Sequence, residues 1–299
     1  MKKLILVALS LTLFSFVFSQ TRPVVSESLR EIAVRKGYQA PAVEGFTKAP
    51  VVPGNKNTVV IEEDIIGSTR YDLQTNTSIQ NRIHVYDDGT IGATWTFGLN
   101  DPAFADRGTG YNYFDGNNWA PEPTARIESI RTGWPSYTAY GEGGELVVSH
   151  DFGPGRLMLS KRNQKGTGTW TESFLNGPGV QISWPRAMTS GINNSVIQVL
   201  AITWPTPNGG PVYQGLDGAV LYSRSSDGGL TWNPENSILP GITSSEYAGF
   251  SADDYEWATQ GNNIAFLLGD TWFDFILMKS ADGGDTWSKT IIWEHPYPF

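Results

Sequence analysis

The 299-residue sequence contains no cysteine. Disulfide bonds are therefore excluded, although small extracellular proteins often depend on them. The folded chain has to be stabilised by its apolar core, and its length is sufficient to bury one. A lipid anchor attached to an N-terminal cysteine is excluded as well.

Positive charge and histidine are also scarce. The chain has 21 Lys and Arg against 30 Asp and Glu, a net charge of −9, so it lacks the basic surface that a nucleic-acid partner requires. The three histidines, His84, His150 and His295, lie far apart and show no metal-ligand spacing. No phosphate-binding loop or nucleophile elbow is present. The sequence predicts neither a metal site nor a cofactor.

Only one long apolar run occurs, from Leu4 to Phe18, directly after Lys2 and Lys3. A short apolar run behind a positive N-terminus and before small residues is typical of a secretory signal peptide. We expect residues 1–19 to be removed and the protein to be secreted or held at the cell surface, with no membrane span in the mature chain. The alternative is an uncleaved anchor, for which the run is short.

Glycine, tryptophan and tyrosine are abundant, with 33, 11 and 12 residues respectively. Frequent turns combined with frequent aromatic residues indicate many short strands. Residues 20–57 are interpreted as a leader and linker, because three prolines follow a short helix-like stretch. From residue 58 onward, alternating apolar residues around turns such as "DDG" predict β-hairpins.

A strand–turn–strand unit recurs, and its final tryptophans are Trp119, Trp170, Trp232 and Trp287. Their spacing of about 50–60 residues is typical of propeller blades. The sequence predicts an all-β fold: a β-propeller of four-stranded antiparallel blades, about four to five of them, in residues 58–299.

The octapeptides "SSDGGLTW" (residues 225–232) and "SADGGDTW" (residues 280–287) close the last two units. Each lies between two predicted strands, so each is expected to form a hairpin turn in which glycine permits a positive φ and Asp accepts backbone N–H groups. A calcium loop would need more oxygen ligands, and a carboxylate repeated in successive blades could not converge on one catalytic centre. The structural residues of the two copies are Ser225, Asp227, Gly229, Thr231, Trp232, Ser280, Asp282, Gly284, Thr286 and Trp287.

These octapeptides resemble the Asp box, or BNR repeat, of the sialidase-like β-propellers. The resemblance covers roughly residues 58–299 and implies Asp boxes on the blade periphery, away from the ligand face. It also implies six blades, so either this chain closes with fewer or it is truncated at its C-terminus; we expect truncation. The Arg-Ile-Pro motif of catalytic sialidases is absent, so the catalytic residues are unknown.

Candidate ligand residues lie at the expected starts of the inner strands, where propellers bind their ligands. "WPS" and "WPR" recur one blade apart, which indicates either a repeated blade corner or an aromatic face that stacks on sugar rings. The ligand-binding candidates are Arg82, Trp134, Trp184, Arg186 and Tyr255.

Two functions are compatible with this sequence. The first is a secreted recognition or interaction module for a glycan or a surface polymer. The second is an exo-acting glycoside hydrolase of the sialidase type, with part of its site beyond this sequence. The missing Arg-Ile-Pro favours the first, and the oligomeric state is left open.

Overall fold

The computed structural model describes residues 63–75, 78, 79, 81–153 and 155–296. One compact unit extends over Glu63–Phe299. The predicted signal peptide (1–19) and linker (20–57) lie outside the described residues, as do the first residues of the predicted propeller.

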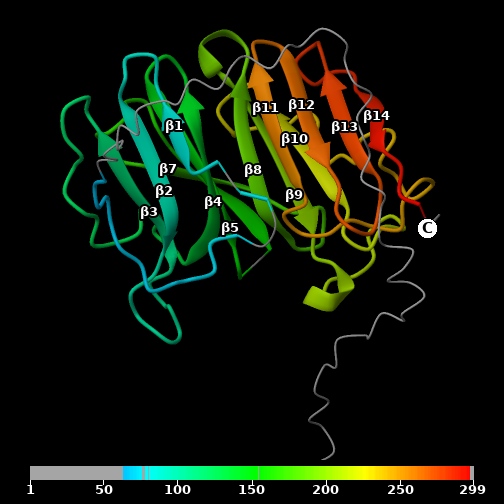
Figure 1. The fold of residues 1–299 in the computed structure, drawn as a ribbon, viewed down its shortest axis with the longest axis horizontal. Helices are drawn as coiled ribbons and strands as arrows, with labels where there is room; N and C mark the ends of the chain where they lie inside the picture. Colours follow the sequence, from blue (N-terminus) through cyan, green and yellow to red (C-terminus); the bar gives the residue numbers. More distant parts are fainter. Residues whose placement is uncertain (1–62, 76–77, 80, 154, 297–299) are drawn as a thin grey trace, which may run out of the picture. The chain divides into compact units, whose positions relative to one another are not determined.

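The described chain is built from strands joined by turns and two short 3₁₀ helices (Figure 1). The elements are β1 (Ile83–Val85), β2 (Ile91–Phe97), β3 (Gly108–Phe114), β4 (Thr132–Tyr140), β5 (Gly144–Asp151), β6 (Arg156–Arg162), β7 (Thr171–Leu175), β8 (Ile182–Ser190), η2 (Ile192–Asn194), β9 (Val196–Thr203), η3 (Thr206–Asn208), β10 (Val220–Ser225), β11 (Tyr255–Gln260), β12 (Asn263–Leu268), β13 (Phe275–Ser280) and β14 (Ser288–Trp293).

The strands form four antiparallel sheets, each made of strands that follow one another in the sequence. We call them blade 1 (β1–β3), blade 2 (β4–β7), blade 3 (β8–β10) and blade 4 (β11–β14). This is the architecture of propeller blades, so the predicted all-β propeller fold is confirmed, with four blades in the described residues.

Two blades have one strand fewer than predicted. Blades 1 and 3 contain three named strands, and the outer strand is replaced by a single bridge, Phe114–Trp119 in blade 1 and Tyr222–Ser237 in blade 3. In blade 3 the expected outer strand contains Pro234, which has no N–H to donate, and Asn236, whose φ of 48° interrupts the extended backbone. Proline and positive φ therefore limit the ladder that the alternating pattern had predicted.

Side-chain hydroxyls connect the innermost strands of successive blades. Thr189 Oγ1 on β8 donates to the carbonyl of Ala139 on β4 at 2.7 Å, and Thr259 Oγ1 on β11 donates to the carbonyl of Thr189 at 2.6 Å. Ser136 Oγ accepts the N–H of Ala187 at 2.8 Å. Because ladder hydrogen bonds run only within a blade, these hydroxyls supply polar links between blades.

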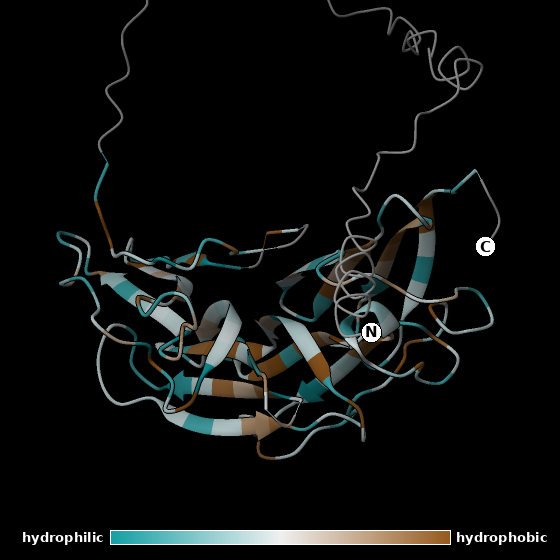
Figure 2. Ribbon diagram, turned by 90° about the horizontal axis from the view of Figure 1, so that it is seen from below, coloured by the Kyte–Doolittle hydropathy of each residue, from teal (hydrophilic) through white to brown (hydrophobic). Residues whose placement is uncertain are grey.

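The core lies mainly between blades 2, 3 and 4. Hydropathy varies along each strand, as expected when its successive side chains point to opposite faces (Figure 2). Fully buried side chains come from β5, β6, β9, β10 and β12, among them Val148, Leu159, Val199, Leu221 and Phe266. Burial of such side chains stabilises the fold by about 1.5–3 kcal/mol each.

Each octapeptide closes its turn with its own side chains. In the second copy, Ser280 Oγ donates to Asp282 at 2.7 Å and accepts the N–H of Gly284 at 2.8 Å. Asp282 also accepts the N–H of Thr286 at 2.9 Å and its hydroxyl at 2.6 Å. The first copy repeats this pattern with Ser225, Asp227, Gly229 and Thr231. The turn is thus an internally hydrogen-bonded unit.

Each octapeptide also rests on the blade that precedes it. The carbonyl of Gly283 in blade 4 accepts from Arg224 Nη1 of blade 3 at 3.0 Å. Tyr222 of blade 3 packs edge-on against Trp287, with ring centroids 5.1 Å apart. In the same way, the carbonyl of Gly228 in blade 3 accepts from Lys161 of blade 2. The two turns therefore connect neighbouring blades.

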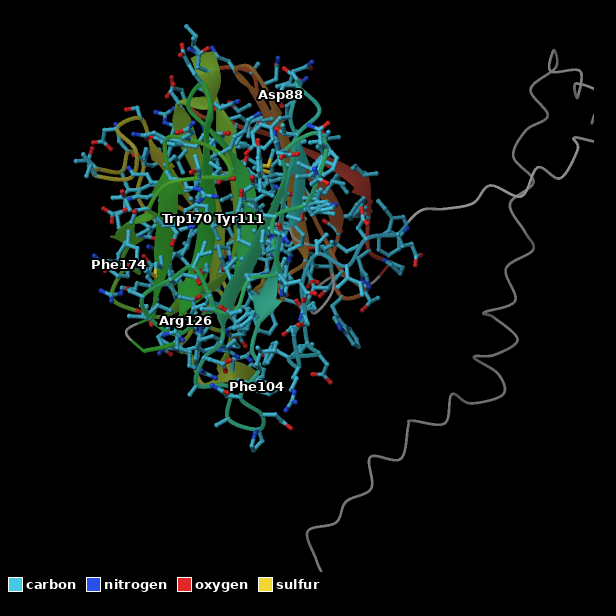
Figure 3. The ribbon with its side chains drawn as sticks, turned by 90° about the vertical axis from the view of Figure 1, so that its left-hand side faces the viewer. Asp88, Phe104, Tyr111, Arg126, Trp170 and Phe174 are labelled. Carbon is cyan, nitrogen blue, oxygen red and sulfur yellow. The ribbon has the colours of Figure 1, made fainter. Side chains whose placement is uncertain are left out.

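In blade 2 a buried acid takes the place of the octapeptide's Asp. The turn after β6 has the eroded sequence "NQKGTGTW", and the buried Glu145 of β5 accepts the N–H of its Gly166 at 3.1 Å. Glu145 is paired with Arg162 at 2.5 Å, and the Arg162 guanidinium lies over the rings of Tyr111 and Trp170. These two rings lie side by side, with centroids 5.4 Å apart (Figure 3). In this blade the carboxylate that accepts a backbone N–H of the turn thus comes from a neighbouring strand and not from the turn itself.

Within the second octapeptide, Gly284 is harder to replace than its neighbour Gly283. A Cβ on Gly284 would lie 1.9 Å from Tyr222 Oη, and its φ is +95°, whereas a Cβ on Gly283, at φ +75°, meets nothing within 4 Å. We expect Gly284→Ala to lower the free energy of unfolding by about 3 kcal/mol and Gly283→Ala by about 1 kcal/mol, measured by urea unfolding. Equal losses would contradict the described packing.

Candidate functional site

The inner strands of blades 2, 3 and 4 begin with the same backbone feature. Trp134, Trp184 and Asp253 have φ values of 50°, 52° and 64°, in the left-handed region that few non-glycine residues adopt. The ladders of β4 and β8 shift register at the two Trp-Pro corners, which is the mark of a β-bulge. Sequence alone gave no reason to equate Asp253 with the two tryptophans, because blade 4 has no Trp-Pro.

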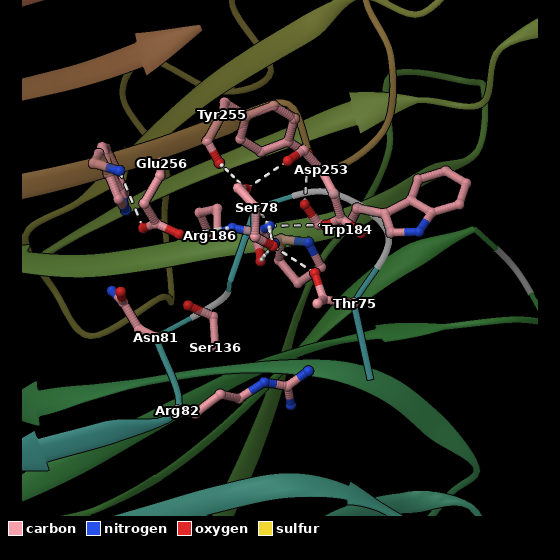
Figure 4. A network of polar contacts seen from close by, with 12 residues as sticks. Thr75, Ser78, Asn81, Arg82, Ser136, Trp184, Arg186, Asp253, Tyr255 and Glu256 are labelled. Atoms are coloured by element: carbon pink, nitrogen blue, oxygen red, sulfur yellow. Dashed lines mark hydrogen bonds and ion pairs between the residues drawn. The ribbon is translucent and has the colours of Figure 1, made fainter. Parts of the chain in front are cut away.

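Asp253 is the centre of a buried polar network (Figure 4). Its side chain is 0% exposed, and its carboxylate contacts Arg186 Nη2 at 2.9 Å. The indole Nε1 of Trp134 donates to its other oxygen at 3.0 Å. The network therefore joins residues of blades 2, 3 and 4.

All three guanidinium nitrogens of Arg186 have hydrogen-bond or ion-pair partners within the protein. Arg186 is 0% exposed, and its Nε pairs with Glu256 at 3.1 Å. Its Nη1 donates to the carbonyl of Pro185 at 3.3 Å, and its Nη2 donates to Ser78 Oγ at 2.9 Å in addition to Asp253. No nitrogen of this guanidinium is available to a ligand in this structure.

The remaining predicted ligand residues surround the same pair. Tyr255 donates its hydroxyl to the carbonyl of Trp184 at 2.5 Å, and burial raises the pKa of that hydroxyl well above its usual value. Arg82 Nη2 donates to the carbonyl of Gln74 at 2.6 Å. Burial, and then the nearby charge of Arg186, lower the pKa of Arg82 to about 9.

The five predicted residues, Arg82, Trp134, Trp184, Arg186 and Tyr255, thus gather around one centre, as inner-strand starts should. Their polar groups are bound by the protein itself: Trp134 and Arg186 contact Asp253, and Tyr255 and Arg82 donate to backbone carbonyls. Sequence reasoning missed Asp253, whose carboxylate contacts two of them, Trp134 and Arg186.

Glu256 is a partly exposed member of this network. Its side chain is 31% exposed and accepts from Arg186 and from the backbone N–H of Trp257. Burial raises the pKa of its carboxyl above the usual value, although the charge of Arg186 opposes the shift. A carboxyl of this kind can hold a proton nearer to neutral pH than an exposed glutamate.

An open hollow of about 420 Å³ lies between connections of blades 3 and 4. It is formed by the β9–β10 connection, the segment before β11 and the β12–β13 connection. Since β10 and β13 start at this end and run to the octapeptides, the hollow and the octapeptides lie at opposite ends of these strands. Its lining residues are Pro205, Pro207, Asn208, Asp217, Tyr247, Ala248, Gly249, Phe250, Ser251, Ala252, Asp270, Trp272 and Phe273.

The hollow combines an aromatic floor with one exposed ring. Phe250 and Phe273 are buried and pack edge-on with centroids 5.0 Å apart, and Tyr247 lies 5.3 Å from Phe250. Trp272, in contrast, is 69% exposed. A large exposed indole beside a rigid apolar floor is a surface on which a flat apolar face can stack.

Two carboxylates flank these rings, and local hydrogen bonds hold both in place. Asp270 accepts the backbone N–H of Trp272 at 2.6 Å and the hydroxyl of Ser251 at 2.7 Å. Asp217 accepts the N–H and the hydroxyl of Thr206 at 2.6 and 2.7 Å. Since a carboxylate has about four lone-pair sites, each retains acceptor capacity for a ligand hydroxyl.

Within the part of the chain that the structure describes, no group of three His, Asp or Glu side chains could hold a metal ion. In the same residues, no helix has the length and apolar character required to cross a membrane.

No protein-family model and no curated protein matches the sequence. The chain is similar in structure to propeller glycoside hydrolases and to a propeller lectin. A family 117 glycoside hydrolase from Zobellia galactanivorans is 12% identical, with a TM-score of 0.44, over 71% of this chain and 68% of that one. The GH93 α-L-arabinofuranosidase of Fusarium graminearum is 14% identical, with a TM-score of 0.44, over 71% and 65%.

A fucose-specific lectin from Aleuria aurantia is 11% identical, with a TM-score of 0.39, over 70% of this chain and 58% of the lectin. At such low identity, these likenesses concern the arrangement of strands and carry no information on a ligand.

The network predicts that removing one partner of the Arg186–Asp253 pair lowers the free energy of unfolding more than neutralising both partners does. We expect Arg186→Met to lower the free energy of unfolding by about 3–5 kcal/mol, because Asp253 is then a buried charge without its partner. The double variant Arg186→Met/Asp253→Asn should recover part of this loss, since Asn also tolerates a positive φ. Urea unfolding measures both.

A suitable control is Lys289→Met, which removes a longer surface pair with Glu246 (3.9 Å) and should cost less than about 1 kcal/mol. If the changes in unfolding free energy caused by the Arg186 and Asp253 substitutions were additive, the two groups would not be coupled and the described network would be wrong.

Proposed function

We propose that this protein is a secreted or cell-surface recognition module that binds neutral carbohydrate in the hollow between blades 3 and 4. The observation that carries this proposal is the exposed ring of Trp272 beside the aromatic floor of Phe250 and Phe273, with Asp217 and Asp270 in the same lining. Sugars present an apolar C–H face and a rim of hydroxyls, which match a ring and fixed carboxylate acceptors respectively.

The size and charge of the hollow support a neutral ligand. Its volume of about 420 Å³ is within the usual range of small-molecule sites, enough for a short stretch of a glycan. Both acidic residues of its lining repel anionic sugars, as does the net charge of −9. Uronic or sialic acids are therefore disfavoured as ligands at this surface.

We also propose that the octapeptides are Asp boxes and that the chain is related to the sialidase-like propellers. The shared hydrogen-bond pattern of the two turns and their position away from the hollow support this relation. The expected signal peptide supports secretion.

A glycoside hydrolase is the second candidate, and Glu256 is the observation that favours it. This carboxyl is partly exposed and has a raised pKa, both of which suit a general acid. Against a sialidase mechanism, Arg186 is fully occupied by Asp253, Glu256 and Ser78.

Binding can be tested with Trp272→Ala and a matched tryptophan elsewhere. On an array of neutral and acidic glycans, we expect the protein to bind neutral members, and Trp272→Ala to weaken that binding about tenfold or more, because stacking contributes about 1.4 kcal/mol. Trp293→Ala removes a 44% exposed tryptophan from β14 and should leave binding unchanged. Retained binding by Trp272→Ala, or exclusive binding to acidic glycans, would refute the proposed site.

Hydrolysis is tested on the same glycans. For a binding module we expect no release of reducing sugar from any glycan that is bound. Release that falls by a factor of about 10² or more in Glu256→Gln, with binding retained, would instead establish the hydrolase and assign Glu256 as its acid.

A further inference from the structure

In blades 2 and 3, a cation at the end of the third strand binds the blade that follows. We call the turn after the third strand the closing turn: residues 115–118, 163–169, 226–231 and 281–286 in blades 1 to 4. Lys161 of β6 donates to the carbonyl of Gly228 in the closing turn of blade 3. Arg224 of β10 donates to the carbonyl of Gly283 in the closing turn of blade 4, at 3.0 Å. The same contact is therefore made at two successive blade junctions.

Lys279 has the corresponding position in blade 4. Lys161, Arg224 and Lys279 are each the next-to-last residue of their strand. Lys279 is exposed, its ammonium forms no ion pair among the described residues, and its hydrogen bond with Ser288 involves the backbone carbonyl of Lys279. A donor that is used in blades 2 and 3 is thus unused in blade 4.

The face of blade 4 that is turned away from blade 3 carries small and apolar side chains. Strand contacts join the blades in chain order, so blades 1 and 4 each pack on one neighbouring blade (Figure 1). On β11, Tyr255 faces blade 3, since its hydroxyl binds a carbonyl there, and the alternate residue Ala258 lies on the free face. Ala258, Ala265 and Lys279 are cross-strand neighbours, and Leu267 on the same face is 38% exposed.

Blade 1 has the opposite face free, and the side chains near its closing turn are large. Val85, Ile91 and Phe114 are cross-strand neighbours, and Phe114 packs on Trp119 with centroids 5.5 Å apart. Val85 is 64% exposed. The alternate residues face blade 2, as the contact of Tyr113 with the closing turn of blade 2 indicates. Small side chains on blade 4 thus match large ones on blade 1.

The closing turn of blade 1 is an acceptor that lacks a donor. Asp115 holds the turn in shape by accepting the N–H groups of Asn117 and Asn118, each at 2.8 Å. A Cβ on Gly116 would meet nothing within 4 Å, and the carbonyl of Gly116 accepts no hydrogen bond from the described residues. The two unused halves of the repeated junction, the cation and the turn, therefore both belong to this chain.

We propose that two copies of this chain associate about a two-fold axis, with the free face of blade 4 of each copy against the free face of blade 1 of the other. Lys279 then donates to the closing turn around Gly116 of the partner copy, and Ala258 and Ala265 receive the large side chains beside that turn. Two such junctions close a ring of eight blades, within the usual range of propellers. This interface is independent of the proposed carbohydrate site.

The oligomeric state and its dependence on blade 4 test this proposal. Sedimentation equilibrium should show twice the mass of one chain, and Ala258→Glu should raise the dissociation constant about tenfold or more, because it places a charge in both junctions. Ala103→Glu makes the same change at an exposed alanine of the β2–β3 connection and should leave the dimer intact. A monomeric protein, or equal weakening by the two variants, would overturn the proposal.

The absence of cysteine allows the arrangement itself to be tested by cross-linking. Lys279→Cys and Asn117→Cys proteins, when mixed, should be joined by a short bismaleimide, whereas neither should be joined to itself. Lys289→Cys is the control, because Lys289 is paired with Met278 on the face toward blade 3 and should not react with Asn117→Cys. If Lys279→Cys were joined to itself, blade 4 would pack against blade 4 and the proposed arrangement would be wrong.

Discussion

The buried pair of Arg186 and Asp253 is the constraint on which the inner end of the molecule depends. A guanidinium and a carboxylate with no exposed surface are stable only if nearly every polar atom of both is satisfied, and Ser78, Trp134 and Glu256 supply the remaining contacts. These partners come from all four blades or the segments that lead into them. Any relative displacement of the blades therefore leaves a buried charge unsatisfied. Apolar packing tolerates small shifts, whereas this network specifies one arrangement.

The same constraint explains where recognition can take place. Residues at the starts of the inner strands have the chemistry of a ligand site, but here they are occupied in holding the blades together. The hollow, in contrast, is open and is made by the β9–β10 and β12–β13 connections and the segment before β11, where Trp272 is exposed beside the packed rings of Phe250 and Phe273. Loops presented by a fixed scaffold are a common location for binding residues. If the proposed function holds, the inner network has a structural role and the hollow a recognition role in different parts of the same blades.

Much of the fold was predictable from the sequence, because it depends on local patterns. The recurring tryptophans identified the blades, and the predicted inner-strand starts coincide with the beginnings of β4, β8 and β11 or lie just before them. The contacts within the candidate site were harder to predict from the sequence. The contact between Arg186 and Asp253 depends on the packing of blade 3 against blade 4. Asp253 has the same positive φ as the tryptophans of the two Trp-Pro corners, but no Trp-Pro sequence marks its position. The hollow brings together Pro205, Phe250 and Trp272 from three connections, a proximity that no local pattern records. The missing outer strand of blade 3 reflects Pro234 and Asn236, which override the alternation around them.

The turns at the opposite end have an implication for how such a protein can evolve. Each octapeptide completes its own hydrogen bonds and then rests on the blade before it, so at this end of the strands the contacts of each turn are with the preceding blade. A duplicated unit added after an existing blade would carry its own closing turn and would find the donors for that turn already present on the blade before it. An insertion ahead of a blade would have to reproduce the surface it displaces. Growth of this architecture by tandem duplication is therefore easiest at the C-terminal side of a blade.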